Sequence, residues 1–161
     1  MADTQGFYKG LRILWSAEKM LTEAMPGMIA KASHLGLKKN LAMHLAETDT
    51  HKSAIGLICK QLGIDPEGEP DQTLQGILEN GQKAMSSASP GTALDEVIIQ
   101  GAREVEKYEI ESYTALSQLA EDLEYHPVAQ RLRLTLEEER QADTKLRFLF
   151  KEGLHMEERV V

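Results

Sequence analysis

The sequence predicts an all-α fold, an antiparallel bundle of four long helices. Leu, Ala, Glu, Lys and Met outnumber the β-branched and aromatic residues, a composition that favours helix over sheet. Glycines and prolines divide the chain into a few long segments with helical spacing of apolar residues. With 161 residues, 42% of them hydrophobic, the chain is long enough for one packed core, and we expect a single domain over residues 1–161.

The first two helices are predicted at residues 5–34 and 38–62. Asp3 or Thr4 can cap the first helix, and Gly36 follows its end in the position where helices often terminate at glycine. Gly63 ends the second helix in the same way. Because only a few residues connect the two helices, they are expected to be antiparallel neighbours.

A long connection over residues 63–91 separates these helices from the next pair. It contains the loop IDPEGEPDQ, then a short helix TLQGILENGQKAM that Asp71 can cap, and finally an SSASPG turn. The third and fourth long helices are predicted at 92–124 and 127–152, with Pro127 in the first turn of the fourth. One long crossover between the second and third helices is the ferritin-like arrangement of a four-helix bundle.

Composition argues against several functional classes. A net charge of -8 with 5% aromatic residues argues against nucleic-acid binding, which needs a basic surface or stacking platforms. The sequence has no run of about 18 apolar residues, the length that a membrane-spanning helix needs. The single Cys59 lies in an apolar run and cannot form an intramolecular disulfide. A reduced, buried thiol suits the cytoplasm, which is the expected location.

Each predicted long helix has a carboxylate within or beside its apolar stripe, near mid-length. The stripe positions, three and four residues apart, include Glu18 in the first helix, Glu109 in the third, and Glu139 and Asp143 in the fourth. In the second helix the stripe contains His44, Thr48 and His51, with Glu47 beside it. A single polar residue in such a stripe usually fixes helix register or is partly exposed. Acids at the same height in all four helices suggest a shared site.

Two interpretations of this layer remain open. Burying an ionised carboxylate without a cation costs several kcal/mol, so five together must either share protons or bind metal. In the metal interpretation, two divalent ions, expected to be iron with manganese as the alternative, are bound by Glu18, Glu47, His51, Glu109, Glu139 and Asp143. Glu106 and His44 are weaker candidates, because a solvated helix face and a hydrogen-bonded core histidine explain them equally well. Glu137 and Glu138 lie off the stripe and are expected to be solvated.

The spacing of these residues departs from the usual di-metal carboxylate pattern. Such bundles combine one Glu from each of two helices with a Glu-x-x-His from each of the other two. Here Glu47 precedes His51 by four residues, and Glu139 precedes Asp143 by four. At a spacing of four, the second residue of each pair still lies on the same helix face as the first. It points in a different direction from the histidine of a Glu-x-x-His pair. A site with one imidazole is rich in oxygen ligands, which leaves the preferred metal undecided.

Four sequence blocks resemble the YciE/YciF family of bacterial ferritin-like, stress-associated proteins: LWSAEKML at 14–21, HLAET at 44–48, VEKYEIESYTAL at 105–116 and TLEEERQADTKL at 135–146. The resemblance implies a helical, dimeric protein of the bacterial stress response, regarded as di-iron or ferroxidase-like by its fold. Matched position by position, it implies site roles for Glu18, Glu47, Glu106, Glu109, Glu139 and Asp143. It leaves His51 open, because similar proteins often have Gln there, and Lys107 stands where a histidine is expected.

These observations lead to two functional hypotheses. In the first, the protein oxidises Fe(II) with dioxygen or peroxide, and no catalytic residue is needed apart from the metal ligands. In the second, it is a stress-associated structural or metal-binding bundle without catalytic activity. The expected partners are metal ions, dioxygen or peroxide, and a second copy of the chain as a homodimer.

Overall fold

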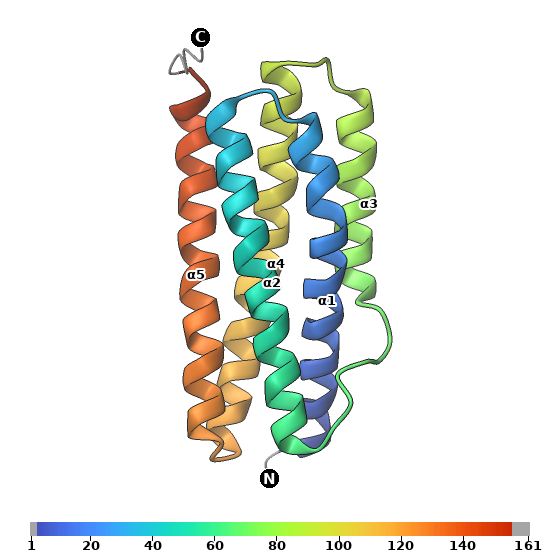
Figure 1. Cartoon of the computed structure of the whole chain (residues 1–161), viewed down its shortest axis with the longest axis vertical. Coiled ribbons are helices and arrows are strands. Elements are labelled where there is room, and N and C mark those ends of the chain that lie inside the picture. Colours follow the sequence, from blue (N-terminus) through green and yellow to red (C-terminus); the bar gives the residue numbers. More distant parts are fainter. Residues whose placement is uncertain (1–2, 156–161) are drawn as a thin grey trace.

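The computed structural model describes residues 3–155, and the regular secondary structure of this part of the chain is entirely helical (Figure 1). No strand occurs within it, so the predicted all-α fold class is confirmed. Five α-helices and a terminal 3₁₀ helix follow in the order α1 (Thr4–Lys31), α2 (Leu35–Leu62), α3 (Gln72–Ser87), α4 (Thr92–Asp122), α5 (His126–Lys151) and η1 (Gly153–His155).

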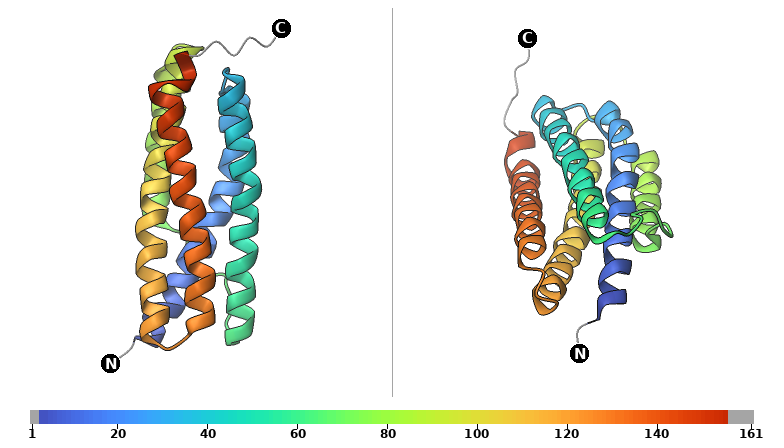
Figure 2. Two further views of the ribbon diagram at one scale, coloured as in Figure 1. Left: turned by 90° about the vertical axis from the view of Figure 1, so that its left-hand side faces the viewer. Right: turned by 60° about the horizontal axis from the view of Figure 1, so that its bottom comes forward.

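The four long helices form two closely packed pairs, α1 with α2 and α4 with α5. Figures 1 and 2 show these helices side by side, with α3 on the outside against α4. The chain crosses from one end of the bundle to the other between α2 and α4, and α3 lies in this crossover. This helix has 16 residues and is slightly longer than the segment predicted from the sequence.

Three of the predicted helix termini are present. A side-chain oxygen of Asp3 accepts a hydrogen bond from the Gly6 N–H at 2.8 Å and caps α1. Asp71 caps α3 by accepting from the Leu74 N–H at 3.1 Å. Gly63 ends α2 with φ 72, in the left-handed region where glycine carries no steric penalty.

The boundary predicted between the first two helices, after residue 34, is wrong. α1 ends at Lys31, and Gly36 lies inside α2 and does not terminate α1. The chain is extended at His34, whose ring nitrogen accepts from the Leu37 N–H at 3.3 Å. Asp95 of α4 also accepts hydrogen bonds from the backbone N–H groups of Ser33 and His34. A contact with a helix 61 residues away in sequence therefore fixes this turn.

The other turn between long helices also differs slightly from the prediction. α4 ends at Asp122, two residues before the predicted end at 124, and α5 covers His126–Lys151, whereas 127–152 was predicted. Glu124 has φ 63, a left-handed conformation that cannot continue the helix.

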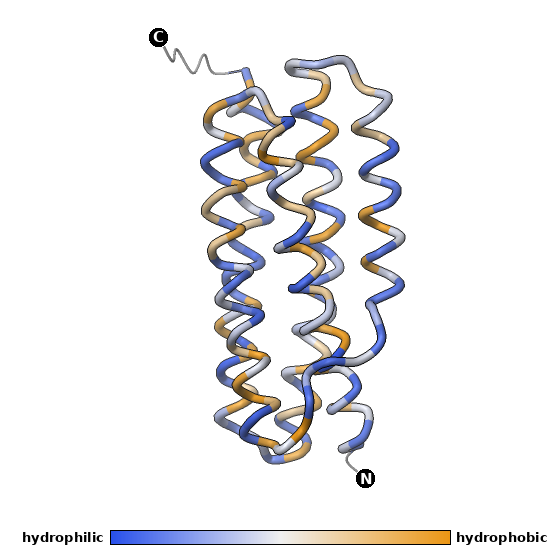
Figure 3. The backbone as a smooth tube through the Cα atoms, turned by 45° about the vertical axis from the view of Figure 1, so that its right-hand side comes forward, coloured by the Kyte–Doolittle hydropathy of each residue, from blue (hydrophilic) through white to orange (hydrophobic). Residues whose placement is uncertain are grey.

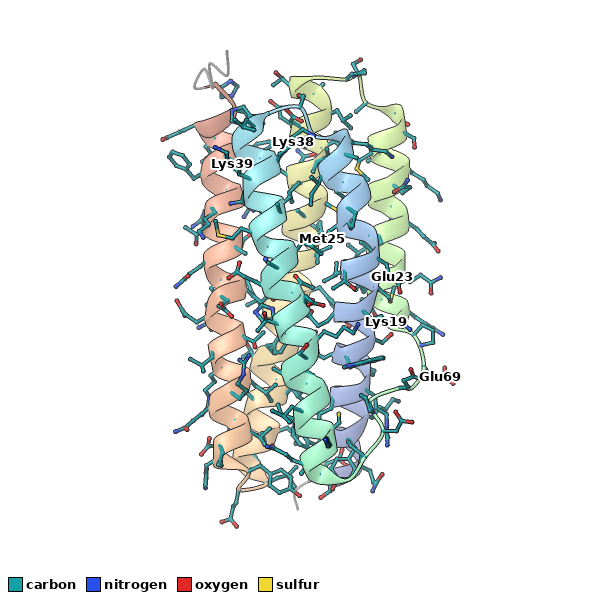
Figure 4. The ribbon with its side chains drawn as sticks, in the orientation of Figure 1. Lys19, Glu23, Met25, Lys38, Lys39 and Glu69 are labelled. Carbon is teal, nitrogen blue, oxygen red and sulfur yellow. The ribbon has the colours of Figure 1, made fainter. Side chains whose placement is uncertain are left out.

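Two apolar clusters fill opposite ends of the bundle. One is built around Phe7, Leu11 and Tyr113, and the other around Leu37, Ile98 and Leu146. Figure 3 shows hydrophobic and hydrophilic segments alternating along the helices, as expected where each helix buries one face. Figure 4 labels members of both faces of α1, the buried Met25 and the exposed Lys19 and Glu23.

Cys59 is fully buried in the first of these clusters, and burial raises the pKa of its thiol. This agrees with the unreactive thiol that its sequence context predicts. Among residues 3–155, no helix combines the length and the apolar character needed to cross a lipid bilayer.

Candidate metal centre

Between the two apolar end clusters, the four long helices bury a layer of ionisable side chains. Their spacing explains why they point inward: Glu106 and Glu109 are three residues apart, and His44 and His51 are seven apart, so each pair shares one helix face. All four carboxylates of the layer are at most 1% exposed. The layer contains Glu18 from α1, His44 and His51 from α2, Glu106 and Glu109 from α4, and Glu139 from α5.

A first group within this layer joins α1, α2 and α5. Nδ1 of His51 lies 2.9 Å from Oε1 of Glu139 and 3.4 Å from Oε2 of Glu18. One ligand atom from each of the three residues lies within 4.8 Å of the other two. These atoms can therefore reach one common metal ion.

A second group joins α2, α4 and α5 and shares Glu139 with the first. Nε2 of His44 lies 2.6 Å from Oε1 of Glu106 and 3.7 Å from Oε2 of Glu139. The two oxygens of Glu139 thus face different groups, Oε1 toward His51 and Oε2 toward His44. Glu139 could therefore supply a ligand atom to an ion held by either group.

Glu109 is the remaining buried carboxylate of the layer and belongs to neither of the two groups. Burial raises the pKa of its carboxyl well above the usual value, and the charges of Glu139 and Glu18 raise it further. The phenol of Tyr113 is buried beside the same carboxylates; burial is the largest cause of its raised pKa, followed by the charges of Glu18 and Glu109. Neither Glu109 oxygen nor the Tyr113 hydroxyl has a hydrogen-bond partner among the described residues.

In the absence of a metal, protons and the two imidazoles neutralise part of the layer. Burial lowers the pKa of His51, but its contacts with Glu139 and Glu18 outweigh this effect and raise the pKa to about 10. Burial raises the pKa of Glu139, but its contacts with Glu106, His51 and His44 bring the value down to about 2. Burial and the Glu139 charge raise the pKa of Glu106 well above normal, so the two carboxyls share one proton, located on Glu106.

The orientation of the polar atoms fits metal ligation better than hydrogen bonding. Although Nδ1 of His51 lies close to Glu139 and Glu18, none of the three groups is aligned as a hydrogen bond to another, and the same holds for Nε2 of His44. Both oxygens of Glu18 and both of Glu139 are buried without a hydrogen-bond partner in the described chain. Buried polar atoms are rarely left unpaired, and a cation between them would satisfy them together. Carboxylate oxygen with imidazole nitrogen suits iron or manganese.

Asp143, predicted as a ligand, does not point to this layer. Its Oδ1 accepts from Nε of Arg103 at 2.9 Å, at the partly exposed edge between α4 and α5. The predicted stripe passes from Glu139 to Asp143, four residues later. In the structure the next buried residue is Ala142, three residues after Glu139, followed by Leu146 and Leu149. Asp143 therefore lies beside the inward stripe.

Two carboxylates lie at the border between the layer and solvent. Glu47, predicted as a ligand, is 28% exposed, and its Oε1 lies 3.8 Å from Nδ1 of His44. Glu138, predicted to be solvated, is 41% exposed, yet its Oε1 lies 2.9 Å from Nε2 of His51. Glu138 is therefore solvated only in part, whereas Glu137 is 59% exposed as predicted. Position in the stripe could not reveal this contact, because it depends on how α2 and α5 pack.

The crossover segment is tied to α4 next to the layer by a contact that helical periodicity does not reveal. Tyr108 donates a hydrogen bond to Oδ2 of Asp71, the residue whose other carboxylate oxygen caps α3. Burial is the largest cause of the raised pKa of Tyr108, and this hydrogen bond raises it further. Tyr108 immediately precedes Glu109 in α4, so the crossover supports the helix that carries two of the buried acids.

Comparison with known protein families gives one match that covers nearly the whole chain. Residues 3–158 match the family described as Domain of unknown function (DUF892). The sequence is 32% identical to Protein YciF of Escherichia coli strain K12 over 133 residues, which is 82% of this chain and 80% of the relative.

Solved structures show the same architecture. The structure of the E. coli stress protein YciF superposes with a TM-score of 0.89 at 30% identity, covering 95% of this chain and 97% of that one. YcfI from Rhodopseudomonas palustris, provisionally described as a structural protein, gives a TM-score of 0.83 at 33% identity, covering 86% and 88%. A protein from Xanthomonas campestris pv. campestris shares the fold at 20% identity, with a TM-score of 0.77 over 94% and 93% of the two chains.

Proposed function

The chain belongs to the DUF892 family of YciF-like proteins, and from this premise we propose that it is a ferritin-like di-metal carboxylate protein of the bacterial stress response. It binds two divalent ions, iron or manganese, and oxidises Fe(II) with dioxygen or peroxide. The stress role is supported by the similarity to YciF, which is described as a stress protein. The ferritin-like assignment is supported by two helix pairs connected by one long crossover.

The observation that carries the metal proposal is the pair of ligand groups that share Glu139. In this proposal Glu18 and His51 bind one ion, Glu106 and His44 bind the other, and Glu139 and Glu109 lie between them. Two divalent ions carry four positive charges, which equals the charge of the four buried carboxylates when all are ionised. The ions would therefore replace the protons and imidazolium charges that neutralise the layer in the metal-free protein.

The surrounding residues would prepare the layer for metal in two ways. Both imidazoles and Glu106 hold protons in the metal-free state, so binding must release protons and is expected to tighten as the pH rises. The apolar clusters on both sides exclude bulk water, which strengthens each ligand contact. Bound iron would supply the one-electron chemistry, and a ligand set rich in carboxylate oxygen favours Fe(III) over Fe(II).

The decisive experiment combines elemental analysis with aerobic addition of Fe(II). Wild-type protein should bind two ions per chain, consume dioxygen in proportion to Fe(II) and form an absorbing ferric species. Glu18→Ala and Glu139→Ala should each lower the oxidation rate at least about 100-fold, since each removes a buried ligand. Glu23→Ala, on the exposed face of α1, should behave like wild type. Wild-type rates in both ligand variants would refute the oxidase proposal.

A second candidate function is a non-catalytic structural or metal-binding bundle. The short contacts from His44 to Glu106 and from His51 to Glu139 favour it, because they neutralise part of the layer without metal. It predicts a folded metal-free protein and no Fe(II) oxidation. Under this function Glu109→Gln should leave the melting temperature unchanged or raise it, since it removes a buried acid whose pKa is raised by burial. Loss of folding in this variant would contradict the structural role.

We further propose that the chain forms a homodimer in the cytoplasm. Four large apolar side chains are exposed on two adjacent helices, Met43 and Leu57 on α2 and Leu134 and Phe148 on α5. Large apolar side chains exposed on two neighbouring helices could be covered by a second copy of the chain. Sedimentation equilibrium should give about twice the chain mass of 18.0 kDa, and a monomer at micromolar concentration would exclude the dimer.

A further inference from the structure

Glu138 contacts the ring of His51 on the side away from the buried acids Glu18 and Glu139. Its Oε1 lies 2.9 Å from Nε2 of His51, while Nδ1 of the same ring faces Glu139 and Glu18. The two nitrogens of an imidazole point away from each other, so the ring connects a half-exposed carboxylate with the candidate metal centre. His51 itself is fully buried.

The position of Glu138 follows from the geometry of α5. Successive residues of a helix are rotated by about 100°, so Glu139 points into the bundle, Glu138 points to the edge facing α2, and Glu137 points to solvent. The exposure of the side chains follows this order, 0%, 41% and 59%. Glu137 is therefore a matched control, with the same side chain on the same turn and no contact with His51.

A neutral imidazole carries one proton, and only the nitrogen without it can bind a metal. A carboxylate that accepts a hydrogen bond from Nε2–H keeps the proton there, turns the lone pair of Nδ1 toward the cluster and increases its basicity. We propose that Glu138 is a positioning residue that fixes His51 as an Nδ1 ligand of the metal ion bound with Glu18 and Glu139. This inference rests on the proposed metal centre and adds the residue that orients its nitrogen ligand.

His44 provides a contrast within the same layer. Its Nε2 faces Glu106 and Glu139, but its Nδ1 is 3.8 Å from Glu47 and has no hydrogen-bond partner among residues 3–155. The described chain therefore fixes the outward nitrogen of His51 and leaves that of His44 without a fixed partner. The ion next to His51 is expected to bind with the more rigid ligand set.

The test measures Co(II) binding by the visible absorption of the bound ion, in competition with a chelator of known affinity. Glu138→Ala should weaken binding at one of the two sites about 10- to 100-fold. Glu138→Gln should lose less, because its amide oxygen still accepts from Nε2–H. Glu137→Ala should stay within about two-fold of wild type, and circular dichroism should show that each metal-free variant is folded.

Two further readouts separate positioning from a general effect of charge. The Co(II) protein should show a paramagnetically shifted imidazole N–H proton that disappears in D₂O; in Glu138→Ala this signal should be lost to exchange, and in Glu137→Ala it should remain. In a His51→Ala background, Glu138→Ala should have no additional effect on Co(II) affinity.

Three results would overturn the inference. The first is wild-type Co(II) affinity with a retained N–H signal in Glu138→Ala, and the second is an equal loss of Co(II) affinity in Glu137→Ala and Glu138→Ala. The third is an undiminished effect of Glu138→Ala on Co(II) affinity in the His51→Ala background. A wild-type protein that binds no Co(II) overturns both this inference and the proposed metal centre. Co(II) binding that is insensitive to Glu138 overturns the inference alone.

Discussion

At the scale of single residues, the central feature is Glu139, whose two oxygens face two different imidazoles. Its neighbours determine its protonation: contacts with Glu106, His51 and His44 outweigh burial and lower its pKa to about 2, whereas burial and the charge of Glu139 raise the pKa of Glu106. Two carboxyls from different helices thus differ in charge because of their surroundings. The local sequence around Glu106 and Glu139 does not indicate which of the two carboxyls is ionised.

The protonation of His51 leads to a prediction for the metal-free protein. Its pKa is raised from 6.5 to about 10 in the folded state, despite burial, by Glu139 and Glu18. The stabilisation is fully present below about pH 6.5 and is lost as the pH rises through about 10. His51 alone should therefore lower the free energy of unfolding by up to about 1.4 kcal/mol per pH unit across this window.

Urea denaturation between pH 6 and 10, with chelator present, measures this slope. His51→Gln should make the slope shallower without abolishing it, because His44, Glu106 and Glu109 also have raised pKa values in the folded state. The exposed His126→Gln should leave the slope unchanged. A wild-type slope in the His51→Gln variant would show that His51 does not contribute to the pH dependence.

At the scale of helices, the turn between α1 and α2 shows how a distant element sets a boundary. Asp95, in the first turn of α4, accepts from the Ser33 N–H at 2.8 Å, the Ser33 hydroxyl at 2.7 Å and the His34 N–H at 3.0 Å. Asp95 is 2% exposed, so water cannot readily replace these bonds. The turn is therefore held by a residue more than 60 positions away.

This arrangement predicts a large loss of stability in Asp95→Ala. The change removes three hydrogen bonds to a charged acceptor and leaves two backbone N–H groups without partners, which should cost about 2–4 kcal/mol. Ser33→Ala removes only the hydroxyl bond and should cost about 1 kcal/mol. The free energies of unfolding from urea denaturation test both values. A loss within about 0.5 kcal/mol for Asp95→Ala would mean that the turn forms without this contact.

Helix caps and glycines show how far local sequence determines the elements. Asp3, Asp71 and Gly63 were identified correctly, because capping depends on residues within one turn. The prediction that Gly36 ends the first helix is wrong, because nothing in the nearby sequence indicates that Asp95 stabilises an earlier turn. The predicted apolar stripe of α5 agrees with the structure up to Glu139 and differs from it at Asp143. Residues three and four positions after Glu139 both lie near the inward face of the helix, so the sequence does not decide between them.

At the scale of the whole molecule, the polar layer between two apolar clusters predicts that stability depends on metal. Ions that bind the folded chain and not the unfolded chain stabilise it by about 2.7 kcal/mol per site at a free concentration 100 times the dissociation constant. Thermal unfolding in increasing Co(II) should therefore show a rising melting temperature. The Glu18→Gln, Glu139→Gln double variant should be folded and should show little of this increase. An equal increase in both proteins would place the bound ions elsewhere.

The sequence by itself determined the all-α class, the helix order and the inward direction of Glu18, Glu109 and Glu139, because helical periodicity and local capping are encoded within a few turns. Only the tertiary structure decided which side chains meet. It joined His44 with Glu106, His51 with Glu138, and Asp143 with Arg103. These contacts depend on the axial offset and rotation of packed helices, which result from the packing of the whole core.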